Sequence, residues 1–251
     1  MEGIKQVLAQ KYKTSEKYTF EDFVHIIEAL RAPDGCPWDR AQTHESLRPC
    51  MMEEAAEVLS AIRILRDTGE GENLREELGD VLMQVVLHSQ IASEQEIFSL
   101  EDVIDEVSTK MIRRHPHVFG DFKEGEPLRD WEEIKQKEKE GKSWIESPLR
   151  EIPPELPALS RASKVLKKID RLYQPVASKE DSVLKLEKNV QQLKNLVEKN
   201  VEEKEDAEII VGSMLLEISN IARLYRFSGE QLLTDEIEHM IEAFEPDRRK
   251  S

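Results

Sequence analysis

Four acidic side chains in two neighbouring segments have the spacing of a metal site: Glu54 and Glu57, then Glu77 and Asp80. Members of each pair are three residues apart, so on a helix they share a face. Apolar residues flank both pairs, which places each pair beside a buried stripe. Carboxylates gathered this closely repel one another unless they take up protons or share a cation. A hard divalent ion such as Mg²⁺, which prefers oxygen ligands, removes that repulsion.

The same acids also fit a simpler interpretation as a solvated surface. The chain carries 52 acidic and 36 basic residues, a formal net charge of -16, so one E-x-x-E pair means little. Two pairs on consecutive helices are more specific, yet their spacing leaves metal binding and a solvated face equally open. The adjacent acids Glu53 and Glu76 are candidates for orienting a water or accepting its proton.

Basic residues follow the acidic pairs at the end of a third predicted helix. Lys110 and Arg114 are four residues apart, with Arg113 beside them. A guanidinium holds phosphate oxygens through two hydrogen bonds, and an ammonium adds a point charge. Such residues also complement a helix dipole, and taken alone that is the better explanation. Next to an acidic metal site they indicate phosphate binding.

Two tryptophans are candidates for contacts with a base. Trp131 lies in a strongly polar segment with Lys135 four residues further on. It either stacks on a base or covers an edge of the core, and the sequence leaves both open. Trp38 follows a Pro-Asp-Gly break, and it either lines a base pocket or packs internally.

Helices must position these residues. Apolar residues recur at spacings of three and four, and Ser99 with Asp102 fits a capping box at the start of a helix. Short connections between the helices favour antiparallel neighbours, as in a four-helix bundle. The predicted helices of the first half cover 20–32, 47–67, 73–93, 99–114 and, in a charged segment, 131–139.

The second half reads as a degenerate copy of the first. A proline-rich segment at 148–157 separates the two, which predicts domains at 1–145 and 146–251. Residues 51–63 align with 186–198, and 79–82 align with 212–215. The predicted fold class is all-α, with two helical bundles in tandem. The helices expected in the second half cover 158–172, 179–203, 207–227 and 229–244.

Composition limits the partners and the compartment. The acidic surface repels nucleic-acid backbones and anionic membranes, so neither is an expected partner. The first residues lack the apolar core of a signal peptide, and the chain has no apolar run near the roughly 20 residues of a membrane helix. Two cysteines, Cys36 and Cys50, are too few for a disulfide framework. These features predict a cytoplasmic protein.

Together, several motifs resemble the MazG family of nucleoside triphosphate pyrophosphohydrolases. The resemblance runs from about Phe20 to Lys139, with a weaker second copy to Phe244. It implies an all-α homodimer that hydrolyses nucleoside triphosphates to the monophosphate and pyrophosphate, clearing unwanted nucleotides. The motifs are GCPWD at 35–39, QTH at 42–44, EEAAE at 53–57, EELGD at 76–80, KMIRRHPHVFG at 110–120 and DW at 130–131.

The resemblance also implies roles for individual residues. Glu54, Glu57, Glu77 and Asp80 would bind Mg²⁺, with Mn²⁺ as a substitute. Lys110 and Arg114 would hold phosphates, and Trp131 and Lys135 would complete the nucleotide pocket. The second copy departs from this pattern, because Glu54 and Glu57 align with Asn189 and Gln192, while Glu77 and Asp80 align with Ile210 and Ser213. The sequence therefore predicts that the second copy is catalytically silent.

Two rival interpretations remain. A ferritin-like di-iron protein needs paired Glu-x-x-His motifs on facing helices, but here Glu236 and His239 form one such motif outside the acidic pairs. A non-catalytic helical dimerisation or scaffold protein, with a vestigial acidic metal site, is the stronger alternative. It predicts that Mg²⁺ and a nucleotide together do not stabilise the chain.

Overall fold

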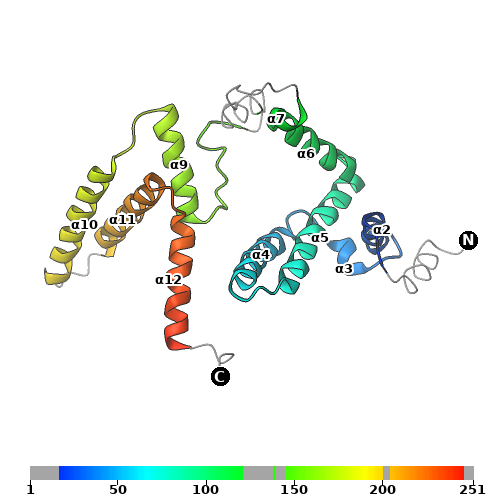
Figure 1. Cartoon of the computed structure of the whole chain (residues 1–251), viewed down its shortest axis with the longest axis horizontal. Helices are drawn as coiled ribbons and strands as arrows, with labels where there is room; N and C mark the ends of the chain where they lie inside the picture. The colour runs from blue at the N-terminus through cyan, green and yellow to red at the C-terminus, as the bar shows by residue number, and fades with distance from the viewer. Residues whose placement is uncertain (1–16, 121–137, 139–144, 200–203, 246–251) are drawn as a thin grey trace, which may run out of the picture. The chain divides into compact units, whose positions relative to one another are not determined.

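The computed structural model describes residues 17–120, 138, 145–199 and 204–245, and the regular elements within these ranges are all helices. The all-α fold class is thereby confirmed. The chain divides into two compact units, Met1–Ile134 and Lys135–Ser251 (Figure 1). The domain boundary expected after residue 145 stays a prediction. The helix expected over 131–139 lies outside the described residues, apart from residue 138.

Helix α5 is the centre of the first unit, because α2, α4 and α6 all contact it. The capping box predicted at Ser99 and Asp102 is confirmed at the start of α6, and Thr19 with Asp22 forms another at the start of α2. No helix in the described ranges is long and apolar enough to span a bilayer. The helices of this unit are α2 (Phe20–Arg31), α3 (Pro37–Ala41), α4 (Arg48–Thr68), α5 (Glu72–Glu94), α6 (Leu100–Arg114) and α7 (Pro116–Phe119).

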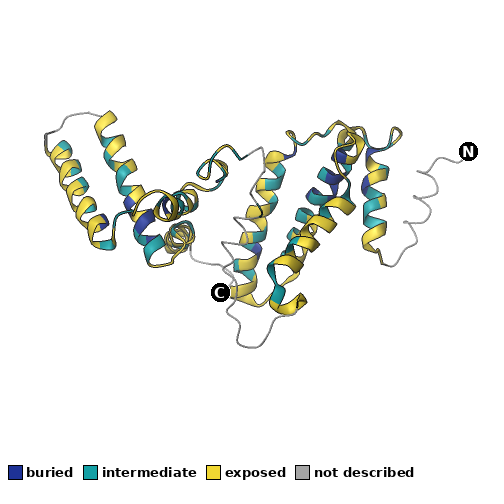
Figure 2. Ribbon diagram, turned by 90° about the horizontal axis from the view of Figure 1, so that it is seen from above, coloured by how far each residue is buried: buried dark blue, intermediate teal, exposed yellow. Residues whose placement is uncertain are grey.

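The buried core of the first unit lies around the second half of α5. Ile27, Leu47, Val86, Leu87 and Ile91 are each at most 4% exposed. Figure 2 shows how few helical turns are buried to this extent. Many large apolar side chains elsewhere on α4, α5 and α6 are exposed, among them Leu59, Ile62, Leu78, Leu82 and Val107.

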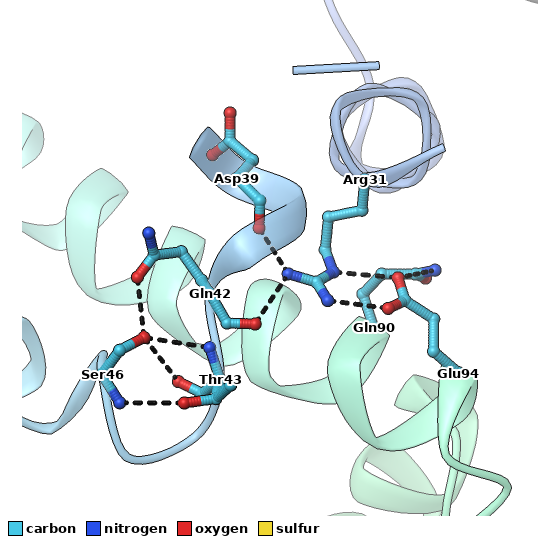
Figure 3. A network of polar contacts seen from close by, with 7 residues as sticks. All are labelled: Arg31, Asp39, Gln42, Thr43, Ser46, Gln90 and Glu94. Carbon is cyan, nitrogen blue, oxygen red and sulfur yellow. Dashed lines mark hydrogen bonds and ion pairs between the residues drawn. The ribbon is translucent and has the colours of Figure 1, made fainter. Parts of the chain in front are cut away.

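One buried arginine fastens the loop that leads into α4 (Figure 3). The guanidinium of Arg31 donates to both carboxylate oxygens of Glu94, at 2.9 and 2.7 Å. It also donates to the backbone carbonyls of Asp39 and Gln42. This pairing lowers the pKa of Glu94. One side chain therefore ties α2, the end of α5 and the loop around α3 together.

The second unit is arranged around α11, which contacts α9, α10 and α12. Helix α11 begins and ends three residues before the expected bounds. Its early end is explained by Arg226, which takes a left-handed φ of 64° in the turn that follows. Residues 200–203, expected as the end of α10, lie outside the described ranges. The helices are α9 (Ala158–Leu172), α10 (Lys179–Lys199), α11 (Lys204–Leu224) and α12 (Gly229–Phe244).

The turns after α5 and α11 share an unusual geometry that supports an internal duplication. Glu96 has a positive φ of 57°, matching Arg226 in the second unit. In both turns the next amide donates five residues back, from Ile97 to Ala92 at 3.0 Å and from Phe227 to Ala222 at 2.8 Å. A serine then caps the following helix in each unit.

Candidate functional site

Helices α4 and α5 form the hairpin that carries the predicted metal ligands. Helix α4 ends at Gly69, whose left-handed φ of 78° is strained for any residue with a Cβ atom. The Gly69 amide donates to the carbonyl oxygen of Leu65 at 2.8 Å, which closes the last turn. The chain then reverses into α5, so that the acids of α4 come to face those of α5.

Three of the four predicted ligands converge. Each of Glu54, Glu57 and Glu77 offers one carboxylate oxygen within 4.8 Å of the others. Glu54 and Glu77 are half-buried and Glu57 is exposed. Asp80 is not a member of this group of three, but it is close enough to act on the charge of Glu54. The three carboxylates that converge are called the acidic cluster below.

The pKa of Glu54 is raised above its ordinary value. Desolvation is the largest cause, followed by the negative charges of Asp80 and Glu57. A raised carboxyl pKa means that the ionised form of Glu54 is less favourable at this site than in water. Because a hard divalent cation stabilises that form with oxygen ligands alone, the residues present fit an ion of this class.

Two carboxamides beside the cluster were missed by sequence reasoning. The amide nitrogen of Asn73 donates to Glu77 at 2.7 Å. A hydrogen bond from Gln84 to Glu54 opposes the rise in the pKa of Glu54. Each amide lies four residues from a predicted ligand on α5, at Glu77 and Asp80. That spacing, which places side chains on one helical face, was the signal that could have revealed them.

The remaining candidates do not gather at the cluster within one chain. Glu53 and Glu76 are exposed neighbours of cluster residues. Lys110 and Arg114 are half-buried and Arg113 is exposed, all near the far end of α6. Figure 1 shows that the end of α6 adjoining α7 lies apart from the α4–α5 hairpin.

The predicted base contacts have different outcomes. Trp38 is 63% exposed on α3, and its part in a base pocket stays a prediction. Trp131 and Lys135 lie outside the described residues.

A histidine pair joins α5 to the loop before α4. His44 and His88 stack with parallel rings, and their Nδ1 atoms are 2.8 Å apart. Burial, followed by the charge of His44, lowers the pKa of His88. His88 is eight residues beyond Asp80, about 12 Å along α5, so this pair is separate from the acidic cluster.

In the second unit, side chains near the positions of the acids form a hydrogen bond and an ion pair with one another. Asn189, which aligns with Glu54, donates to the hydroxyl of Ser213 at 3.0 Å. Ser213 aligns with Asp80, so a neutral hydrogen bond stands where the first unit has two carboxylates. One turn further on, Lys185 pairs with Glu217 at 3.0 Å. No group of three or more metal-ligating side chains occurs in the described part of this unit.

Comparisons with known proteins agree with this geometry. The model of the MazG nucleotide pyrophosphohydrolase domain matches residues 42–119, which include the acidic cluster. The chain is also 40% identical over 225 residues to the nucleoside triphosphate pyrophosphohydrolase/pyrophosphatase MazG of Thermotoga maritima, covering 90% of this chain and 84% of that protein. The chain belongs to the MazG family.

Two other relatives match a smaller share of the chain. The nucleoside triphosphate pyrophosphohydrolase of Escherichia coli K12 is 44% identical over 147 residues, covering 57% of this chain and 54% of that protein. The uncharacterised protein YabN of Bacillus subtilis is 48% identical over 153 residues, covering 60% of this chain and 30% of its own length.

Proposed function

We propose that this MazG protein hydrolyses nucleoside triphosphates to the monophosphate and pyrophosphate. Its relative in Thermotoga maritima is named a nucleoside triphosphate pyrophosphohydrolase/pyrophosphatase. The observation that carries the proposal is the convergence of Glu54, Glu57 and Glu77 within 4.8 Å. We assign Mg²⁺ to this cluster, with Asp80 as a fourth ligand and Mn²⁺ as a substitute. The ion would neutralise phosphate charge and lower the pKa of a bound water.

The protein's own residues would do the remaining work. The cluster carboxylates bind the ion, while the Asn73 amide fixes the orientation of Glu77. Glu53 and Glu76 are exposed beside the cluster, so either could accept a proton from the attacking water. Both cysteines are free thiols, in keeping with the reducing cytoplasm that we propose as its compartment.

The test is release of pyrophosphate from common and damaged nucleoside triphosphates, with and without Mg²⁺. Glu77→Gln should lower turnover at least about 100-fold, since even outer-shell changes at metal sites commonly cost 10- to 100-fold. Glu187→Gln makes the same chemical change at an exposed site on α10 and should keep the parental rate. Absence of Mg²⁺-dependent release in the parent would favour the non-catalytic scaffold.

We assign the substrate phosphates to Lys110 and Arg114. Lys110→Ala should raise KM about tenfold, because one charge-assisted contact contributes roughly 1.5 kcal/mol. The affinity for Mg²⁺ without nucleotide should not change, since Lys110 is on α6 and not on the ligand-bearing hairpin. A variant with unchanged KM would remove Lys110 from the phosphate site.

We also propose that the chain forms a homodimer through the hairpin. Leu59, Ile62, Leu78 and Leu82 remain 41–67% exposed on α4 and α5, and a second copy would cover them. The α6 of a partner subunit could then approach the acidic cluster of this chain. The end of this chain's own α6 that adjoins α7 lies apart from that cluster (Figure 1). Sedimentation should give twice the chain mass of 29.1 kDa, and Leu82→Glu should yield monomers. A parent that sediments as a monomer would refute this assembly.

A further inference from the structure

The strongest unexplained feature of the first unit is the buried amide of Gln84. This side chain lies between α4 and α5 at 3% exposure. Its amide lies near enough to the Glu54 carboxyl group to oppose the rise in that group's pKa. Since a carboxylate only accepts hydrogen bonds, the amide nitrogen is the end of Gln84 that can face Glu54. The amide oxygen is buried and has no hydrogen-bond partner among the described residues.

A buried amide oxygen without a hydrogen-bond donor destabilises the folded state. Leaving a buried acceptor unsatisfied carries a desolvation penalty, so natural structures rarely keep one without a reason. The oxygen belongs to the same planar amide as the nitrogen that faces Glu54, so it lies beside the acidic cluster. Carboxylates cannot satisfy it, because they too are acceptors, whereas a water held by a cation can donate to it.

The second unit supplies an internal comparison. Glu217 aligns with Gln84, and it is also buried, at 8% exposure. There the acceptor is satisfied within the chain, because the ammonium of Lys185 donates to it at 3.0 Å. Lys185 aligns with Cys50, whose short, neutral side chain cannot donate to the residue at position 84 as an ammonium group would. The buried acceptor is therefore satisfied in the unit without the acids, whereas in the unit with the acids it has no hydrogen-bond partner among the described residues.

We infer that Gln84 is a positioning residue for the metal site: its amide nitrogen orients Glu54, and its buried oxygen accepts a hydrogen bond from a water on the divalent ion. This inference rests on the proposed ion at the acidic cluster, but not on which substrate is hydrolysed. Outer-shell partners of this kind commonly change metal affinity 10- to 100-fold.

The test compares ion binding in full-length variants by titration calorimetry with Mn²⁺ and no nucleotide. Gln84→Met keeps the length of the side chain and removes both polar groups. Its affinity for Mn²⁺ should fall at least about tenfold. Without the ion, its melting temperature should equal or exceed that of the parent, because an orphaned acceptor has been removed.

A matched control lies on the same helix. Gln90 also donates to a carboxylate, that of Glu94 at 3.1 Å, outside the acidic cluster. Gln90→Met should bind Mn²⁺ like the parent. If Gln84→Met folds poorly, Gln84→Asn keeps the amide but shortens its reach, and it should also lose affinity.

The outcomes separate this inference from the proposed function. Parental Mn²⁺ affinity in both Gln84 variants, or a lowered ion-free melting temperature with unchanged affinity, would overturn the role of Gln84. A parent that binds no Mn²⁺ would overturn it as well. A parent that binds Mn²⁺ through Gln84 but releases no pyrophosphate would leave the inference standing and overturn the proposed function.

Discussion

Neutralising Glu54 should affect stability in opposite directions with and without a divalent ion. Its carboxylate shares a space 4.8 Å across with Glu57 and Glu77. Two unit charges at 4.8 Å repel by about 0.9 kcal/mol in water and about 3.5 kcal/mol at an effective dielectric constant of about 20. Glu57 is exposed, so its pair lies near the lower value.

Allowing for this screening, the ion-free Glu54→Gln variant should be more stable than the parent by about 1 to 2 kcal/mol. Addition of Mg²⁺ should reverse the order. An ion at about 100 times its dissociation constant stabilises a folded protein by about 2.7 kcal/mol, and the variant lacks one ligand and one charge. We expect the variant to recover less than about 1 kcal/mol under the same conditions.

Urea unfolding followed by circular dichroism, with EDTA and with a series of Mg²⁺ concentrations, measures both effects. Glu187→Gln removes the same charge from an exposed site on α10, and it should stay within about 0.5 kcal/mol of the parent in each condition. The electrostatic reasoning fails if ion-free Glu54→Gln is less stable than the parent while Mg²⁺ stabilises both proteins equally.

Two further predictions concern the supports of the hairpin. The folded-state pKa of His88 lies below its ordinary value, so the unfolded chain binds more protons as pH falls through the histidine range. Stability should therefore fall between about pH 7 and pH 5, and urea unfolding of His88→Gln should show a flatter pH profile. Arg31→Met removes a side chain that is 4% exposed and paired with Glu94, and it should cost about 2 to 4 kcal/mol in the same assay. A loss below about 0.5 kcal/mol would show that the loop does not depend on Arg31.

Sequence periodicity predicted the helices well because their signals are local. A few adjacent residues determine where a helix begins or ends, as in the cap formed by Ser99 with Asp102 and the left-handed Gly69. The direction of α6 is different, since it depends on Glu96 adopting a left-handed φ of 57°. A glutamate does not predict such a turn, because the left-handed region of φ and ψ is favoured by glycine and, less often, by asparagine.

The site was predictable in its charges and not in its supporting contacts. Spacing placed Glu54, Glu57 and Glu77 on facing surfaces, and the structure brings these three together. Their spacing puts Gln84 and Asn73 on the same helical face as the predicted ligands, but only the structure shows that Gln84 is buried and that Asn73 donates to Glu77. The roles of Lys110, Arg114 and Asp80 stay predictions.

The internal duplication explains why acids persist in one copy. A carboxylate cluster destabilises an ion-free helix hairpin, so a copy released from ion binding gains by losing it. The second unit shows the result, with Asn189 bonded to Ser213 and the Lys185–Glu217 ion pair where the first unit has carboxylates and an unmet amide oxygen. Retention of the acids in the first unit is therefore best explained by a ligand that offsets their repulsion, which is what a divalent cation does.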